Sequence, residues 1–278
     1  MLPSEKLHIA KESLADKFSG FIPKIGITLG SGLGNLIEQL EDASSCAYSE
    51  IPYFPESKVA GHSNRLCWGR LGTVNVVIMQ GRVHLYEGFT SEEVVFPTRL
   101  MITLGARTLI LTHAVGGINK EYKPGDFVVD TDHIAWDMAD PLRGDNDPGL
   151  GSRFVALDQV YDPTLIAIAV EAAAEEKIVL HKGVSIFKSG PCFETAAEVE
   201  AMRRLGADVA TMSTIPEIIA AAHMGTKALG IAFVSNMGAG ILKEAVNHDA
   251  VLSNAHSAKD NFARLVQRIV EKITAASS

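Results

Sequence analysis

Hydrophobic positions along the chain follow two alternating patterns: short apolar runs rich in β-branched residues, and longer segments in which apolar residues recur with helical spacing. The short runs predict strands at residues 24–29, 74–80, 107–112, 126–131, 183–188, 208–212 and 228–235. The longer segments predict helices at residues 4–18, 33–40, 91–104, 163–176, 196–205, 216–223 and 249–275. Such alternation favours an α/β fold in which helices flank a mixed, largely buried central β-sheet.

Two of the predicted helices begin with a capping box, in which the first residue and the fourth satisfy each other's backbone. Thr90 with Glu93 forms one such pattern, and Thr214 with Glu217 forms the other. The one long irregular segment covers residues 138–162 and is rich in Asp, Gly and Pro, which is typical of a functional loop. Because no repeat or linker interrupts the chain, we expect a single domain over residues 1–278.

Composition narrows the class of protein. The chain has 278 residues, 47% hydrophobic and 21% charged, with a formal net charge of -8. This balance disfavours a nucleic-acid binder, which needs a basic face, but it permits a small anionic ligand held by local donors. The three cysteines are widely spaced without a CxxC pattern, so we expect neither a disulfide framework nor a zinc site. With no signal-peptide core and no apolar run of about 18 residues, we expect no membrane association and a cytoplasmic setting.

A glycine-rich turn at residues 29–34 (LGSGLG) follows the first predicted strand and opens a helix. Its amides can converge on an anion at the helix N-terminus, and Ser31 adds a hydroxyl donor. The spacing matches neither the dinucleotide fingerprint nor the Walker loop. Taken alone, the turn is either a plain tight turn or an anion cradle.

A second candidate lies at residues 80–88 (QGRVHLYEG), just past a strongly apolar strand. Arg82 and His84 alternate in an extended segment, so both side chains can point to one face, and Tyr86 continues that face. A guanidinium offers a planar fork matched to phosphate oxygens. The alternative is a solvated strand end with an ordinary surface arginine. His62, in a Gly-His pair, is by itself a surface loop residue.

The ends of three further strands carry polar residues. Residues 112–117 (THAVGG) run into two glycines, which predicts a backbone turn, either beside a ligand or simply tight. Ser213, next to Met212, could donate to an anion at a helix start or merely cap that helix. Asn236, after Ser235, carries both a donor and an acceptor, the combination needed to recognise the edge of a base.

The remaining candidates are aromatic and acidic. Phe193 beside Glu194 could supply a stacking face and a carboxylate acceptor, although Glu194 could simply favour a helix start. His248 alone is a polar residue before the last helix. Neither a DxD nor an HExxH pattern accompanies Glu194, so we expect no metal. Because no Ser-His-Asp arrangement supplies a nucleophile, the pattern suits a reaction in which a bound anion attacks.

Together these segments resemble one family, the trimeric, low-molecular-mass purine nucleoside phosphorylases. The matching segments are GSGLG at 30–34, GH at 61–62, MQGRVHLYEG at 79–88, AVGG at 114–117, GPCFETAAEVE at 190–200, LGADVATMSTIPE at 205–217, SN at 235–236 and NHDAVL at 247–252. They occur in family order from about residue 20 onward, and their combination is far more specific than any single segment.

The resemblance implies a role for each matching residue. The implied phosphate site consists of Ser31, His62, Arg82, His84, the backbone of Ala114, and Ser213. The implied nucleoside site consists of Tyr86 and Met212 at the ribose, His248 at its 5′-hydroxyl, Phe193 against the base, Glu194 at N1–H, Asn236 at N7 and O6, and Phe154 from the neighbouring subunit. Among these, Asn236, His84 and Glu194 are the expected catalytic residues.

The resemblance also implies a phosphorylase/hydrolase-like fold, a homotrimer with sites at the subunit interfaces, inorganic phosphate as co-substrate, and no metal or organic cofactor. The implied reaction is reversible phosphorolysis of 6-oxopurine (deoxy)ribonucleosides such as inosine and guanosine. His113 stands where the family usually has Asn, and it could reach base or phosphate; Ser235 stands where Thr is common.

Two alternatives stay open. A methylthioadenosine phosphorylase should carry Asp at the position of Asn236 and lack Phe-Glu-Thr at residues 193–195. A non-catalytic nucleoside-binding protein should bind the base without turnover.

Overall fold

The computed structural model describes residues 1–30, 34–59, 61–242 and 248–276, with the side chains of residues 34–35 and 248–257 left out. The α-helices are α1 (Pro3–Ser13), α2 (Ser91–Leu104), α3 (Pro163–Glu175), α4 (Ala196–Arg204), α5 (Ile215–His223) and α6 (His248–Ala275). The strands are β1 (Ile25–Leu29), β2 (Glu41–Ala47), β3 (Arg65–Leu71), β4 (Val74–Gln80), β5 (Thr108–Gly117), β6 (Phe127–Ala135), β7 (Leu180–Phe187), β8 (Val209–Thr211) and β9 (Lys227–Met237). Three short 3₁₀ helices are η1 (Gly34–Gln39), η2 (Tyr48–Glu50) and η3 (Leu85–Glu87).

The described strands form one mixed sheet in the order β2-β3-β4-β1-β5-β8-β7-β6-β9. Strand β1 runs parallel to β4 and β5, whereas β3 is antiparallel to both β2 and β4. Strand β5 also pairs with β9, so β5, β8, β7, β6 and β9 close into a ring. The sheet is therefore open at β2 and closed into a small barrel at its other end.

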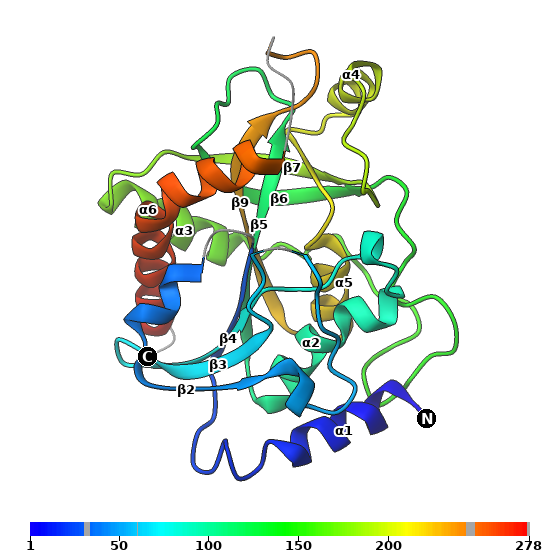
Figure 1. Cartoon of the computed structure of the whole chain (residues 1–278), viewed down its shortest axis with the longest axis vertical. Coiled ribbons are helices and arrows are strands. Elements are labelled where there is room, and N and C mark those ends of the chain that lie inside the picture. The colour runs from blue at the N-terminus through cyan, green and yellow to red at the C-terminus, as the bar shows by residue number, and fades with distance from the viewer. Residues whose placement is uncertain (31–33, 60, 243–247, 277–278) are drawn as a thin grey trace.

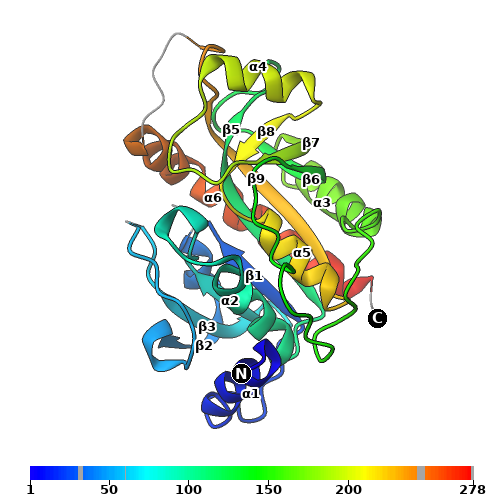
Figure 2. The same ribbon diagram turned by 90° about the vertical axis from the view of Figure 1, so that its right-hand side faces the viewer.

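Helices cover both faces of the sheet, as Figures 1 and 2 show. On one face α3 and α6 pack against inward residues such as Ile27 and Ile231, and Phe262 of α6 is fully buried there. On the other face α1, α2 and α5 cover residues such as Val77 and Leu109. Alternate residues of a strand point to opposite faces, and the two apolar cores follow from that alternation. The predicted α/β fold with a mixed, helix-flanked sheet is confirmed.

Each predicted strand is present, the one at residues 74–80 with the same bounds and the others with shifted ends, but the sequence pattern missed β2 and β3. Strand β2 is exposed along most of its length, so its residues show no apolar alternation. Strand β3 contains Arg65 and Arg70 on exposed positions around a buried centre. The edge strand β2 needs only one paired side and little apolar surface, and in β3 the charged residues interrupt the apolar run; both features hide a strand from a search for hydrophobic periodicity.

Three predicted elements need correction. The helix expected at residues 33–40 is, where described, the 3₁₀ helix η1; among its described side chains only Leu36 is fully buried, which gives so short a segment little apolar surface to anchor it. The helix expected at residues 4–18 ends at Ser13 and continues as turns. The turn expected at residues 112–117 is part of β5, which stays paired with β9 through a shift in register after Val115. Gly117 is needed there for close packing, since a Cβ would lie 2.7 Å from Met237 Sδ.

None of the helices in the described ranges combines the length and apolar character that crossing a bilayer requires.

Candidate active site

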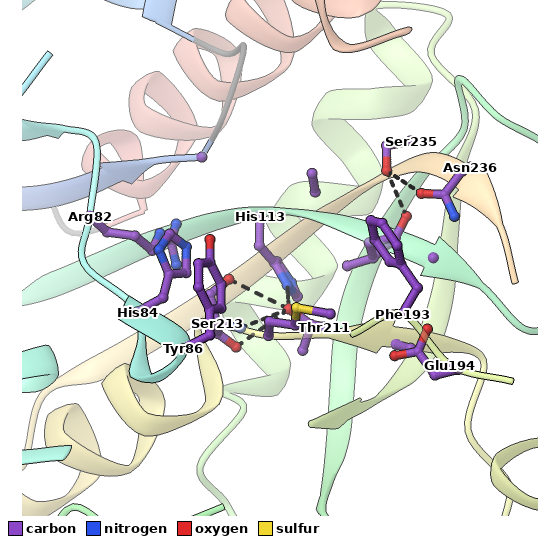
Figure 3. A pocket seen from close by; sticks show the side chains of 16 residues that line it. Arg82, His84, Tyr86, His113, Phe193, Glu194, Thr211, Ser213, Ser235 and Asn236 are labelled. Atoms are coloured by element: carbon purple, nitrogen blue, oxygen red, sulfur yellow. Dashed lines mark hydrogen bonds between the residues drawn. The ribbon is translucent and has the colours of Figure 1, made fainter. Parts of the chain in front are cut away.

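A pocket of about 720 Å³, including its open mouth, lies where the ends of several strands meet (Figure 3). Ligands in α/β sheets gather at such strand ends. The residues that line it are Gly30, Arg82, His84, Tyr86, His113, Ala114, Val115, Gly116, Phe193, Glu194, Ala210, Thr211, Met212, Ser213, Ser235 and Asn236.

Most of the predicted site residues thus surround one pocket, although the sequence separates them by more than 150 positions. Ser31 lies outside the described residues, and so does the side chain of His248, whose backbone begins α6. His62 does not line the pocket, but its ring centre lies 5.5 Å from that of His84. Phe154 lies away from the pocket of its own chain and is 90% exposed.

Figure 3 shows two ends of the pocket with different chemistry. Arg82, His84 and Ser213 lie at one end, together with Tyr86. Phe193, Glu194 and Asn236 lie at the other end. We call these the anion end and the base end.

At the anion end, Arg82 is almost fully buried and firmly held by the protein. Its Nη1 donates to Thr214 Oγ1 at 2.7 Å and to Glu217 Oε2 at 2.6 Å, and its Nη2 donates to the Thr112 carbonyl. A guanidinium has five N–H donors, so these bonds leave two for a ligand. The side chain is therefore fixed in place rather than freely extended at a strand end.

His84 is fixed by Glu87, which lies three residues further along the same segment. Glu87 Oε1 accepts from the His84 backbone N–H at 3.0 Å and lies 3.0 Å from His84 Nδ1. Burial lowers the pKa of His84, and the positive Arg82 acts in the same direction, while Glu87 opposes both. The ring of Tyr86 stacks on His84 with centres 4.6 Å apart. The imidazole is thus held at Nδ1 by Glu87 and on its face by Tyr86, and His84 lines the pocket.

Glu87 is held as an anion. Burial alone would raise its pKa, but hydrogen bonds from His84, from the Lys58 backbone N–H and from the Ser57 hydroxyl lower the pKa to about 2. The bond to Lys58 ties the segment that carries His62 to the anion end.

The segment after β8 carries the other predicted phosphate donor. Ser213 N–H donates to Thr211 Oγ1 at 3.2 Å, which orients the chain before α5. Thr214 follows with a φ of +68°, a conformation that a β-branched residue rarely adopts. The hydrogen bonds of Thr214 to Arg82 and Glu217 offset this strain, so the two predicted phosphate contacts, Arg82 and Ser213, are built into one network.

At the base end, Asn236 is half-buried and its amide is oriented by neighbours. Ser235 Oγ donates to Asn236 Oδ1 at 2.8 Å, and Asn236 Nδ2 donates to the Met237 carbonyl at 3.2 Å. The amide keeps a second N–H and a second acceptor position, the pair of groups needed for a base edge. Burial raises the pKa of Glu194, the second polar group at this end.

Sequence patterns missed several functional contacts. Glu217 matched only a capping box, yet its carboxylate accepts from Arg82 as well as from Thr214 N–H. Glu87 lies in the segment at residues 80–88 but received no role from the pattern, and Asp130 lies in none of the matching segments. A buried arginine needs a carboxylate partner, so the sequence could have indicated that Arg82 has one, but it does not indicate which carboxylate.

The described residues contain no group of three or more His, Cys, Asp or Glu side chains arranged to hold a metal ion. The pocket instead offers cationic and hydroxyl donors at one end, and an aromatic face, a carboxylate and an amide at the other. This arrangement can hold a small oxyanion next to a ring-shaped ligand.

Comparison with known proteins agrees with this geometry. The family model of the phosphorylase superfamily matches residues 24–271. Purine nucleoside phosphorylase 1 of Geobacillus stearothermophilus is 42% identical over 95% of this chain and 96% of its own, and its namesake in Bacillus subtilis is 44% identical over 89% and 92%. A Schistosoma purine nucleoside phosphorylase crystallised with hypoxanthine has a TM-score of 0.91 and 36% identity, covering 97% of both chains. The chain therefore belongs to the phosphorylase superfamily, among the purine nucleoside phosphorylases.

Proposed function

We propose that this protein catalyses the reversible phosphorolysis of 6-oxopurine nucleosides such as inosine and guanosine, giving the free base and ribose 1-phosphate or its deoxy form. The observation that carries the proposal is the single pocket with an anion end and a base end. The hypoxanthine bound by the Schistosoma relative supports the class of base. Inorganic phosphate is then a co-substrate, and no organic cofactor enters the reaction.

Phosphate binds at the anion end in this proposal, through the remaining donors of Arg82, through His84, through the Ser213 hydroxyl and through the backbone of Ala114. Ser31 and His62 complete the set. The sugar then lies between the two ends, against Tyr86 and Met212, which places C1′ near a phosphate oxygen. Holding both reactants in this way supplies the proximity that a bimolecular displacement needs.

The reaction proceeds through an oxocarbenium-like ribose. The C1′–N9 bond breaks and its electron pair moves into the purine, while a phosphate oxygen forms the new bond to C1′. The phosphate anion stabilises the positive sugar, and Asn236 stabilises the negative base by donating its remaining N–H to N7 as that nitrogen gains electron density. Fixed dipoles aimed at developing charge are the largest catalytic contribution in many enzymes. The bond from Ser235 prepares Asn236 for this role.

Glu194 determines the choice of base. Its carboxylate accepts from N1–H, a donor that 6-oxopurines have and adenosine lacks. With adenosine, two acceptors would face each other, and a site left with unpaired polar groups can reject such an analogue by about 10⁴ or more. Asn236 and Phe193-Glu194 also argue against a methylthioadenosine phosphorylase, which should carry Asp at position 236.

We further propose a homotrimer in which Phe154 completes the site of the neighbouring subunit. Its ring is 90% exposed on the long segment at residues 138–162, so it is available to a partner. His248 then contacts the 5′-hydroxyl of the ribose. Size-exclusion chromatography with light scattering tests the trimer, and a monomer would contradict it.

The test of the function is incubation with inosine, with and without phosphate. We expect hypoxanthine and ribose 1-phosphate in equal amounts only when phosphate is present. Free ribose without phosphate would indicate a hydrolase, and binding without turnover would indicate a nucleoside-binding protein. Either result would contradict the proposal.

A further inference from the structure

The ring of strands encloses a layer of polar residues that the proposed mechanism does not use. Four strands contribute one each, namely His113 from β5, Asp130 from β6, Ser185 from β7 and Thr211 from β8, and β9 has Gly230 beside Asp130. The four side chains are at most 3% exposed. Gly230 makes room for the carboxylate, because a Cβ there would collide with Asp130.

Hydrogen bonds connect these side chains into one chain of contacts. His113 Nε2 lies 2.9 Å from Asp130 Oδ2, and His113 Nδ1 lies 2.9 Å from Thr211 Oγ1. The Ser185 hydroxyl donates to the other carboxylate oxygen of Asp130 at 2.6 Å. The contacts continue to the pocket, where Thr211 Oγ1 accepts from Ser213 N–H at 3.2 Å.

One arrangement of protons satisfies the four contacts just described and leaves out the longer contact, 3.4 Å, from Thr211 Oγ1 to the Ser213 carbonyl. Nε2–H of His113 donates to Asp130, and Nδ1 then accepts the hydroxyl proton of Thr211. The Thr211 oxygen remains an acceptor for Ser213 N–H. The Ser213 hydroxyl oxygen lies 3.5 Å from both Thr211 Oγ1 and Thr214 Oγ1, which is long for a bond between two hydroxyl groups, so neither holds its proton strongly. The Ser213 proton is thus left for an oxyanion.

We propose that Asp130 and His113 form a positioning pair for phosphate, which acts through Thr211 to fix the backbone of Ser213 and leave its hydroxyl as a donor to the anion. This inference rests on the proposed phosphate-dependent function. It also gives His113, which replaces the usual Asn of the family, a role: its ring spans the distance from the pocket wall to a carboxylate inside the barrel.

A purely structural role does not explain why a carboxylate and a histidine are buried here. An ionised carboxylate inside a barrel costs free energy that a well-packed apolar residue avoids. The pair also lies where it can act on the pocket, since both His113 and Thr211 line it. The chain has a second pair of the same type, His181 Nε2 with Asp126 Oδ2 at 3.0 Å, but neither of its members lines the pocket. That second pair is a control of the same chemistry, with a more exposed histidine: the side chain of His181 is 30% exposed and that of His113 is 1% exposed.

The first test compares Thr211→Val, which keeps the shape but removes the hydroxyl, with Thr211→Ser, which keeps the hydroxyl. Loss of one hydrogen bond is worth about a factor of ten in binding. We expect Thr211→Val to raise the KM for phosphate about tenfold with the KM for inosine unchanged, and Thr211→Ser to restore the wild-type KM. An equal rise in both KM values, or no rise in either, overturns the inference.

The second test compares Asp130→Asn with Asp126→Asn at the control pair. Each substitution removes one carboxylate charge that faces a histidine. We expect only Asp130→Asn to raise the KM for phosphate, and an equal rise in Asp126→Asn overturns the inference. If the wild-type protein releases hypoxanthine without phosphate, the proposed function is wrong. If the wild-type protein requires phosphate and the Thr211→Val variant has a normal KM for phosphate, only this inference is wrong.

Discussion

Substitution of Glu217 by alanine is the sharpest test of how the anion end is built. The carboxylate of Glu217 is 2.6 Å from Arg82 Nη1, and the side chains of the pair are only 2% and 3% exposed. Glu217→Ala leaves the guanidinium buried without its counter-charge. Breaking such a pair by removing one partner costs about 3–5 kcal/mol. For a chain of this size that corresponds to a Tm lower by roughly 6 °C or more.

A control separates this loss from the general cost of removing a glutamate. Glu171 pairs with Lys272 at 2.8 Å, but its side chain is 64% exposed. Exposed pairs contribute about 0–1 kcal/mol, so Glu171→Ala should leave the unfolding free energy nearly unchanged.

Urea unfolding followed by circular dichroism measures both variants against the wild type. We expect a lower midpoint for Glu217→Ala at an unchanged m-value, which indicates lost stability rather than an altered unfolded state. If Glu217→Ala loses less than about 1 kcal/mol, the carboxylate is not the partner of Arg82 and our description of the anion end is wrong.

The remaining predictions concern the base end and the acid side of the pH range. Asn236→Ala should lower kcat on inosine by roughly 10²–10³, as for loss of one preorganised donor, and an unchanged kcat would remove Asn236 from the mechanism. Because the pKa of Glu194 is raised, its carboxylate gains a proton at a higher pH than an ordinary glutamate, so the KM for inosine should rise as pH falls. Glu194→Gln should flatten this dependence of the KM on pH. A dependence unchanged from the wild type would contradict the role of Glu194 at the base. The pKa of Glu87, about 2 against the usual 4.5, makes its contribution to stability present above pH 4.5 and lost as pH falls toward 2. Glu87→Gln should therefore show less additional destabilisation over that interval in urea titrations, and a wild-type dependence on pH would refute the assignment.

The sequence by itself determined much about this protein. Apolar periodicity identified the α/β class and the buried strands, because a strand covered on both faces must be apolar along its length. Motif combination identified Arg82, His84, Ser213 and Asn236, and the structure places all four around one pocket. These residues could be predicted because the residue type alone shows whether a side chain can donate or accept a hydrogen bond.

Tertiary structure alone decided which distant residues act on one another. The closure of β5 onto β9 brings His113 to Asp130, and no local pattern encodes a contact between strands of a ring. The partnership of Arg82 with Glu217 joins residues 135 positions apart. Both contacts depend on which elements become neighbours in the fold, and the burial of the whole sheet determines this arrangement. Once buried, each charge must find a partner, because an unpaired charge in the interior costs several kcal/mol.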